Sequence, residues 1–292
     1  MSDASITLVE VGARDGLQNE PNAATLDAHT KATFIRMLAQ AGLKRIEGGS
    51  FVHPKAVPAM ANSAEVAALL QPVEADFPDV IFSYLVPNLK GLDRAKDAHA
   101  KEVVVFLALA ESFSRANIQQ GVDESFSAIA PTIAAARAQD MRVRGYISNL
   151  FGYSDYAFTP ADVVKRTHQL LEMGCFEVSL GDTTGIGTAQ TTRMVLDALI
   201  TANTPLEKVA MHFHDTFGNA IANVAVSYEM GIRVFDASTG GLGGCPYANS
   251  PKGNLAMETL VAWATSQHIR CDVQDIAMLE KAAHYMRTAL GK

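Results

Sequence analysis

The chain has 292 residues, of which 48% are hydrophobic, and a formal net charge of −7. This size suffices for one large core, and the acidic balance argues against nucleic acid or an anionic membrane as the main partner. No apolar run approaches the roughly 20 residues that cross a bilayer. The N-terminus carries neither a secretory signal nor an arginine-rich transit peptide, so we expect a cytoplasmic protein. Three cysteines without short pair spacing indicate reduced thiols.

Short β-branched or apolar runs alternate with amphipathic segments along the whole chain. Eight runs are predicted strands: residues 6–11, 45–48, 80–85, 102–107, 142–147, 176–180, 209–214 and 233–237. Helices are predicted between them, including residues 30–41, which Gly42 ends, residues 219–230, and a helix that Thr159 caps before Pro160. Eight strand–helix units at about 35-residue spacing are the signature of an α/β (β/α)₈ TIM barrel.

An open doubly wound sheet is the competing fold. It usually has fewer strands, and no Gly-x-Gly-x-x-Gly follows the first predicted strand. Because no linker or low-complexity segment interrupts the pattern, we expect residues 1–292 to form a single TIM-barrel domain. The barrel is expected over about residues 5–265, with a C-terminal helical extension over about residues 273–290.

Polar side chains gather where the predicted strands end, which is where TIM barrels carry their active sites. In chain order these residues are Arg14 and Asp15, Glu47, Asn88 and Lys90, Asp182, His212 and His214, and finally Cys245 and Asn254. Chance placement would scatter them to both ends of the strands, so this rim is the candidate site.

A metal site is the strongest prediction at this rim. Successive strand side chains point to opposite faces, so His212 and His214 share one face. With Asp15 and the amide oxygen of Asn254 they would supply two imidazoles, a carboxylate and an amide, and leave positions for substrate oxygens. Such a set favours Mg²⁺ or Mn²⁺, with zinc and cobalt as alternatives because imidazole suits them. The plain alternative is two strand-end histidines satisfied by hydrogen bonds.

Arg14 lies beside the predicted ligand Asp15. In an extended segment the two side chains would point in alternate directions, one to the metal and one to the substrate, where a guanidinium suits an enolate or carboxylate oxygen. The alternative is a structural salt bridge with Glu47 or Asp182, and both can hold together.

The segment from Gly240 to Tyr247 is rich in glycine and contains Cys245. A glycine-rich loop can move as a lid, and a thiol there could act as acid or base if its pKa is lowered. Two other interpretations stay open. Cys245 could be an inert small residue in a tight turn, and the glycines could bind a phosphate through backbone N–H groups.

Several motifs resemble 3-hydroxy-3-methylglutaryl-CoA lyase, a family of the DRE-TIM metallolyase group. The motifs are Val9–Glu20, the His212-x-His214-Asp215 run, Gly241–Ala248, Ser50-Phe51-Val52, Pro87–Gly91, Arg144-Gly145-Tyr146 and Ser179–Thr183. They lie between residue 6 and about residue 262, so the likeness covers nearly the whole chain, and the Gly-Leu-Gly-Gly-Cys-Pro-Tyr run is highly specific.

The resemblance implies a divalent-metal-dependent lyase that splits an acyl-CoA into acetyl-CoA and a keto acid. Carried over, the metal ligands are Asp15, His212, His214 and Asn254. Arg14 would stabilise the thioester enolate, His212 or Asp15 would take a proton, Cys245 would lie on the lid, and Glu47 and Asp182 would support the site. We expect Asn88 and Lys90 to contact CoA or substrate. We also expect the protein to form a homodimer or a larger homo-oligomer.

Gly48 and Gly49 depart from the family pattern, where Thr-Thr is usual after the strand-two glutamate. We expect this change to enlarge the substrate pocket, which leaves the acyl group open. The rival functions are a Claisen-type synthase, disfavoured by the short region after the barrel, a metal-dependent aldolase acting on a 2-oxo acid, and a catalytically silent binding module.

Overall fold

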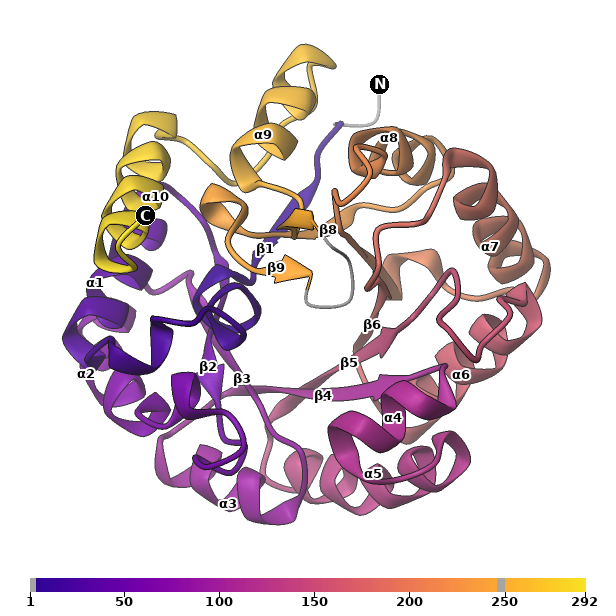
Figure 1. The fold of residues 1–292 in the computed structure, drawn as a ribbon, viewed down its shortest axis with the longest axis horizontal. Coiled ribbons are helices and arrows are strands. Elements are labelled where there is room, and N and C mark those ends of the chain that lie inside the picture. Colours follow the sequence, from indigo (N-terminus) through magenta and orange to yellow (C-terminus); the bar gives the residue numbers. More distant parts are fainter. Residues whose placement is uncertain (1–3, 246–249) are drawn as a thin grey trace.

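The computed structural model describes residues 4–245 and 250–292, and side chains within residues 4–243 and 253–292. Eight parallel strands form a closed barrel in which each strand bonds to the next and β8 returns to β1. Helices surround the strands in a ring (Figure 1). The predicted (β/α)₈ barrel is confirmed, with strands β1 Thr7–Glu10, β2 Arg45–Ser50, β3 Ile81–Leu85, β4 Glu102–Ala108, β5 Arg142–Ser148, β6 Glu177–Asp182, β7 Val209–Phe213 and β8 Val234–Ala237.

The helices follow the strands in the order that the sequence pattern predicts. They are α1 Ala28–Gln40, α2 Ser63–Asp76, α3 Leu89–Asp97, α4 Glu111–Ile118, α5 Val122–Arg137, α6 Pro160–Met173, α7 Ala189–Thr201, α8 Ala220–Glu229, α9 Met257–Ser266 and α10 Ile276–Ala289. The Thr159 cap is confirmed, because its side chain accepts a hydrogen bond from the Asp162 N–H. No helix in the described part of the chain is long and apolar enough to span a membrane.

The two faces of the barrel strands differ in chemistry. On β4, Val103, Val105 and Leu107 belong to the main apolar cluster beneath the helices. Burying each such side chain stabilises the fold by about 1.5–3 kcal/mol. The inward positions of several strands instead carry charged groups that pair across the barrel, as Arg144 on β5 does with Asp236 on β8. The helix side therefore supplies the apolar core, and the barrel interior supplies polar groups for a site.

The predicted C-terminal extension is present as α10. Its apolar residues Leu279 and Met286 are fully buried, and the Leu290 carbonyl accepts a hydrogen bond from Asn22. The chain just before α10 also joins the start of β1, because Ile6 N–H donates to the Arg270 carbonyl. The extension packs against α1 in the outer ring of helices (Figure 1).

The segment after β8 contains secondary structure that we did not predict. A short helical turn, η5 (Thr239–Gly241), leads into strand β9 (Gly244–Cys245), which pairs antiparallel with β10 (Ser250–Gly253). The glycines here enable close approach: a Cβ on Gly243, whose φ is +95°, would lie 2.7 Å from the Asn254 amide nitrogen. Part of the glycine-rich run therefore forms antiparallel strand pairing. Gly243, just before that pairing, packs against the candidate ligand Asn254.

Candidate metal-binding active site

Three potential metal ligands meet at the carboxyl end of the barrel. Each of Asp15, His212 and His214 offers a ligand atom, and these atoms all lie within 4.8 Å of one another; no other such group of histidine, cysteine or acidic residues occurs among the described residues. The two imidazole centroids are 5.3 Å apart, and both rings are buried. The shared strand face thus places the histidines together, and only the closed barrel brings Asp15 to them.

Asp15 reaches this position from a helical turn, and not from an extended segment as we expected. The turn, η1 (Gly12–Gly16), is closed by the Gly16 N–H bonding to the Val11 carbonyl at 3.1 Å. A Cβ on Gly12 would lie 2.5 Å from a Glu10 oxygen, so glycine is required for the close approach. The turn aims Arg14 and Asp15 to the same region, and they bond to each other at 2.8 Å.

Asn254 completes the cluster. Its Nδ2 donates to Asp15 Oδ2 at 2.9 Å and to the Leu242 carbonyl at 3.1 Å, whereas its buried Oδ1 has no hydrogen-bond partner among the described residues. His214 also forms an isolated β-bridge with Asn254. An amide oxygen without a partner, two imidazoles and a carboxylate are the donors that fit a divalent cation such as Mg²⁺ or Mn²⁺.

The ionisation of Asp15 and His214 suits metal binding. Burial opposes ionisation of Asp15, but Arg14 and the two imidazoles outweigh it and hold the Asp15 pKa below its usual value. Burial, helped by His212, lowers the pKa of His214 to about 4, so its imidazole is neutral at neutral pH. A carboxylate and a neutral imidazole are the protonation states that bind a metal ion.

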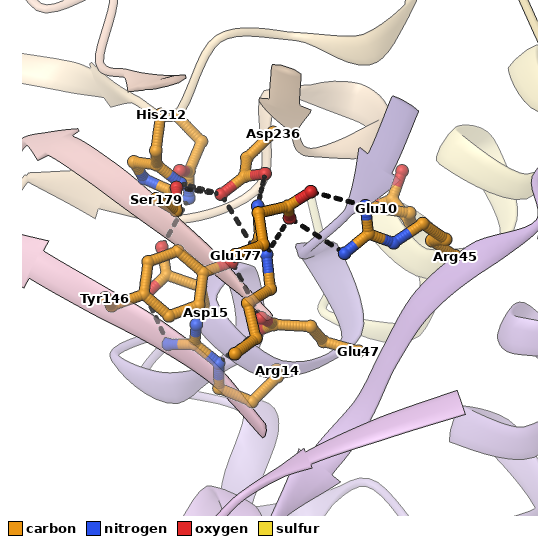
Figure 2. Close-up of polar contacts among 12 residues, drawn as sticks. Glu10, Arg14, Asp15, Arg45, Glu47, Tyr146, Glu177, Ser179, His212 and Asp236 are labelled. Atoms are coloured by element: carbon orange, nitrogen blue, oxygen red, sulfur yellow. Dashed lines mark hydrogen bonds and ion pairs between the residues drawn. The ribbon is translucent and has the colours of Figure 1, made fainter. Parts of the chain in front are cut away.

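Arg14 is held by a buried ion pair with Glu47. Its Nε lies 2.5 Å from Glu47 Oε2, and the other Glu47 oxygen accepts a hydrogen bond from the Tyr146 hydroxyl at 2.7 Å (Figure 2). Burial disfavours the guanidinium cation, but Glu47 and Asp15 outweigh burial and keep the Arg14 pKa above its ordinary value. Arg14 is thus a fixed positive charge directly beside the ligand cluster.

Asp182 does not pair with Arg14. Its Oδ2 accepts a hydrogen bond from the Gly187 N–H at 3.0 Å, so it holds the turn between β6 and α7. Burial raises the pKa of Asp182 to about 7. Of the two salt bridges that the sequence left open for Arg14, the structure contains the one with Glu47.

A second set of charged residues lies inside the barrel, and sequence reasoning missed most of it. Asp236 on β8 contacts Arg144, Ser179 and His212, while Glu177 joins Arg144 to Arg45 (Figure 2). A signal was available: strands buried on both faces should be continuously apolar, and charges at alternate positions within them mark an inward-facing polar row.

For three predicted site residues, the structure does not show a part in catalysis or binding. Cys245 lies in β9, but its side chain falls outside the described residues. Asn88 Oδ1 accepts from the Gly91 N–H at 3.0 Å, so this oxygen caps α3. Lys90 is exposed at the start of α3. The structure therefore gives Asn88 a structural function, and contacts of Asn88 or Lys90 with CoA stay a prediction.

The expectation that Gly48 and Gly49 enlarge the pocket is wrong. The register of β2 with β3 is irregular between Glu47 and Gly49, and the neighbour of Gly48 is Tyr84, a member of the main apolar cluster beneath the helices. A Cβ on Gly48 would lie 3.0–3.2 Å from the Tyr84 ring, and one on Gly49 would lie 2.7 Å from the Ser63 hydroxyl at the start of α2. The missing side chains make room for the helix layer and add no space around the ligand cluster.

Comparison with known proteins gives a consistent family. A model described as HMGL-like matches residues 5–283. The chain is 44% identical to a 3-hydroxy-3-isohexenylglutaryl-CoA/hydroxy-methylglutaryl-CoA lyase of Pseudomonas aeruginosa, over 98% of this chain and 93% of that protein. The solved HMG-CoA lyase of Brucella melitensis has a TM-score of 0.93 and 41% identity, covering 99% of this chain and 100% of that one. An HMG-CoA lyase of Acinetobacter baumannii in complex with coenzyme A and 3-methylmalate has a TM-score of 0.90 and 30% identity, covering 100% and 93%.

Proposed function

The chain belongs to the HMGL-like family and is a carbon–carbon lyase, and we propose that it cleaves 3-hydroxy-3-methylglutaryl-CoA, or a homologue with a larger 3-alkyl group, to acetyl-CoA and a keto acid. For the methyl substrate the keto acid is acetoacetate. The observation that carries this proposal is the meeting of Asp15, His212 and His214 around one point, with the Arg14 cation beside them.

We propose a dependence on Mg²⁺ or Mn²⁺ held by Asp15, His212, His214 and Asn254. When bound, the cation acidifies the tertiary hydroxyl of the substrate. Asp15, acting through a water molecule, then accepts the hydroxyl proton. The electron pair left on oxygen forms the ketone, the C2–C3 bond breaks, and its electrons pass to C2 and the thioester carbonyl.

Arg14 has the position and charge to stabilise that thioester oxygen. Its ion pair with Glu47 fixes the guanidinium before the reaction begins, and pre-positioned charge of this kind is usually the largest single contribution to catalysis. Cys245, carried on the β9–β10 hairpin beside Asn254, is proposed to help deliver a proton to C2, which completes acetyl-CoA.

The decisive experiment is a substrate panel. Protein loaded with Mg²⁺ or Mn²⁺ is incubated with 3-hydroxy-3-methylglutaryl-CoA and with its 3-isohexenyl homologue, and acetyl-CoA and the keto product are quantified together. We expect equal amounts of both products from at least one thioester, and no product after chelation of the metal.

Two results would contradict the proposal. Release of pyruvate from a 4-hydroxy-2-oxo acid, without acetyl-CoA from any thioester, would make the protein an aldolase. Condensation of acetyl-CoA with a 2-oxo acid, without cleavage of either thioester, would make it a Claisen-type synthase. The A. baumannii relative bound to coenzyme A supports a CoA thioester as the substrate class.

A further inference from the structure

We propose that Asp236 is the positioning residue of His212: its carboxylate accepts the Nδ1–H of that imidazole and so presents Nε2 to the metal. The proposal rests on the same metal site as the proposed function. Sequence reasoning did not single out Asp236, because it lies within the short β8 strand and carries no recognisable motif of its own.

The geometry places the two side chains together. Asp236 is opposite His212 in the register of β7 and β8, and both are buried. Asp236 Oδ2 lies 3.5 Å from His212 Nδ1, and this nitrogen has no hydrogen-bond partner closer than that within the described part of the chain. Catalytic hydrogen bonds are often long in ligand-free sites and shorten when the site fills. Metal-ligating histidines almost always donate their other ring N–H to such a group.

Asp236 is itself held rigidly. Arg144 donates to both of its oxygens, at 2.7 Å and 3.2 Å, and Ser179 Oγ donates to Oδ2 at 2.7 Å (Figure 2). A carboxylate fixed by three donors cannot turn away from His212. The imidazole therefore faces an acceptor of fixed position, which selects one ring tautomer and one ring orientation.

The same network reaches Arg14. Arg144 donates to the Tyr146 hydroxyl, Tyr146 donates to Glu47, and Glu47 accepts from Arg14. Asp236 thus lies at one end of a continuous set of hydrogen bonds. The other end is Arg14, whose guanidinium is proposed to act in catalysis. This arrangement fixes the metal ligand and Arg14 relative to one another.

A purely structural explanation exists, since Asp236 also neutralises the buried Arg144. Glu177 does the same from the other side of Arg144, at 2.6 Å, and its two oxygens accept hydrogen bonds from Arg144 and Arg45. Glu177→Gln is therefore a matched control for Asp236→Asn: each removes one negative charge beside Arg144, but only Asp236→Asn replaces the charged acceptor of His212 by a neutral amide.

The test measures Mn²⁺ affinity of the full-length protein by titration, with thermal melts to verify folding. We expect Asp236→Asn to weaken Mn²⁺ binding about 10–100-fold, the range typical when a group supporting a metal ligand is lost, and Glu177→Gln to change it less than about 3-fold. Equal affinities in wild type and a folded Asp236→Asn variant would overturn the proposal, as would equal losses in both variants.

A measurement on the wild-type protein decides the question even if Asp236→Asn does not fold. Nitrogen-15 NMR of histidine-labelled protein with Mg²⁺ reports the tautomer of His212, and we expect the proton on Nδ1. A proton on Nε2 would refute the proposal. Because neither readout uses the lyase reaction, tight metal binding without acetyl-CoA release would refute the proposed function and leave the role of Asp236 intact.

Discussion

Arg14 and Glu47 form an ion pair inside the barrel mouth, with Nε and Oε2 2.5 Å apart and side chains that are 5% and 1% exposed. A pair this deep is strongly destabilising to break, because the remaining charge is left without a partner. It gives little net stability compared with an apolar pair, so its value lies in fixing the Arg14 guanidinium beside Asp15.

Replacing Arg14 by Gln is expected to lower kcat about 10²–10³-fold, the effect typical of losing one pre-positioned group that stabilises developing negative charge. Metal content should change little, because the ligand atoms remain. Steady-state kinetics and metal analysis together check this. Arg36→Gln, which removes an exposed ion pair with Asp76, is the control and should leave kcat unchanged. Near-normal turnover in Arg14→Gln would remove Arg14 from the mechanism.

Replacing His214 by Ala is expected to weaken divalent-metal binding by more than about 100-fold, beyond the effect typical of losing a group that only supports a ligand. Calorimetric titration of the chelator-treated protein with Mn²⁺ measures it. His168→Ala is the matched control, because His168 hydrogen-bonds Thr204 at 2.8 Å on the helix layer. If both variants bind Mn²⁺ like the wild type, the proposed metal site is wrong.

Replacing Cys245 by Ser is expected to reduce the rate and leave the fold intact, because serine keeps the size of the side chain but has a much less acidic proton. The turnover rate and the melting temperature are the two measurements. Cys271→Ser, at a half-buried cysteine before α10, serves as the control and should alter neither. An unchanged rate in the Cys245 variant would return Cys245 to an inert residue in a tight turn.

Replacing Gly48 by Ala should cost stability without changing the choice of acyl group. The new methyl group would lie 3.0–3.2 Å from the Tyr84 ring, and overpacking of this kind typically costs about 1–3 kcal/mol. Denaturant unfolding measures the loss, and the ratio of kcat/KM for the methyl and isohexenyl thioesters tests selectivity. A shift of that ratio by tenfold or more would show that Gly48 borders the substrate after all.

Glu10 predicts a pH dependence of stability. It is fully buried and accepts hydrogen bonds from Gly12 and Thr239, and burial raises its pKa from an ordinary value of 4.5 to about 8. The protonated form is therefore favoured in the fold, so the stabilisation is complete below about pH 4.5 and is lost as the pH rises through about 8. Each unit of pKa difference corresponds to about 1.4 kcal/mol, so the loss amounts to a few kcal/mol.

Glu10→Gln, which mimics the protonated group, should flatten this dependence. Unfolding free energies measured between pH 4.5 and 8 should decline less in the variant than in the wild type. Glu280→Gln, at an exposed position on α10, should leave the wild-type slope unchanged. Parallel curves for all three proteins would show that Glu10 is ionised in the folded state.

Much of the fold is readable from local pattern. Strands such as β4 are runs of β-branched and apolar residues, and their periodicity differs from that of the helices between them, so the eight units and their order follow directly. The η1 turn was not predictable in this way, because its geometry depends on Gly12 packing against Glu10 and Ser238 and on Gly16 packing against Ser238 and Leu242, residues that are up to 226 positions away.

The sequence by itself determined the barrel and the residue types at its catalytic rim, because strand periodicity assigns each side chain to a face and the carboxyl ends of parallel strands meet at one edge. Only the tertiary structure decided which charges pair. Glu47 forms the ion pair with Arg14, and Asp182 accepts a hydrogen bond within the β6–α7 turn. Asp236 lies beside His212. Such pairings depend on barrel closure and on register between strands distant in sequence, which no local pattern records.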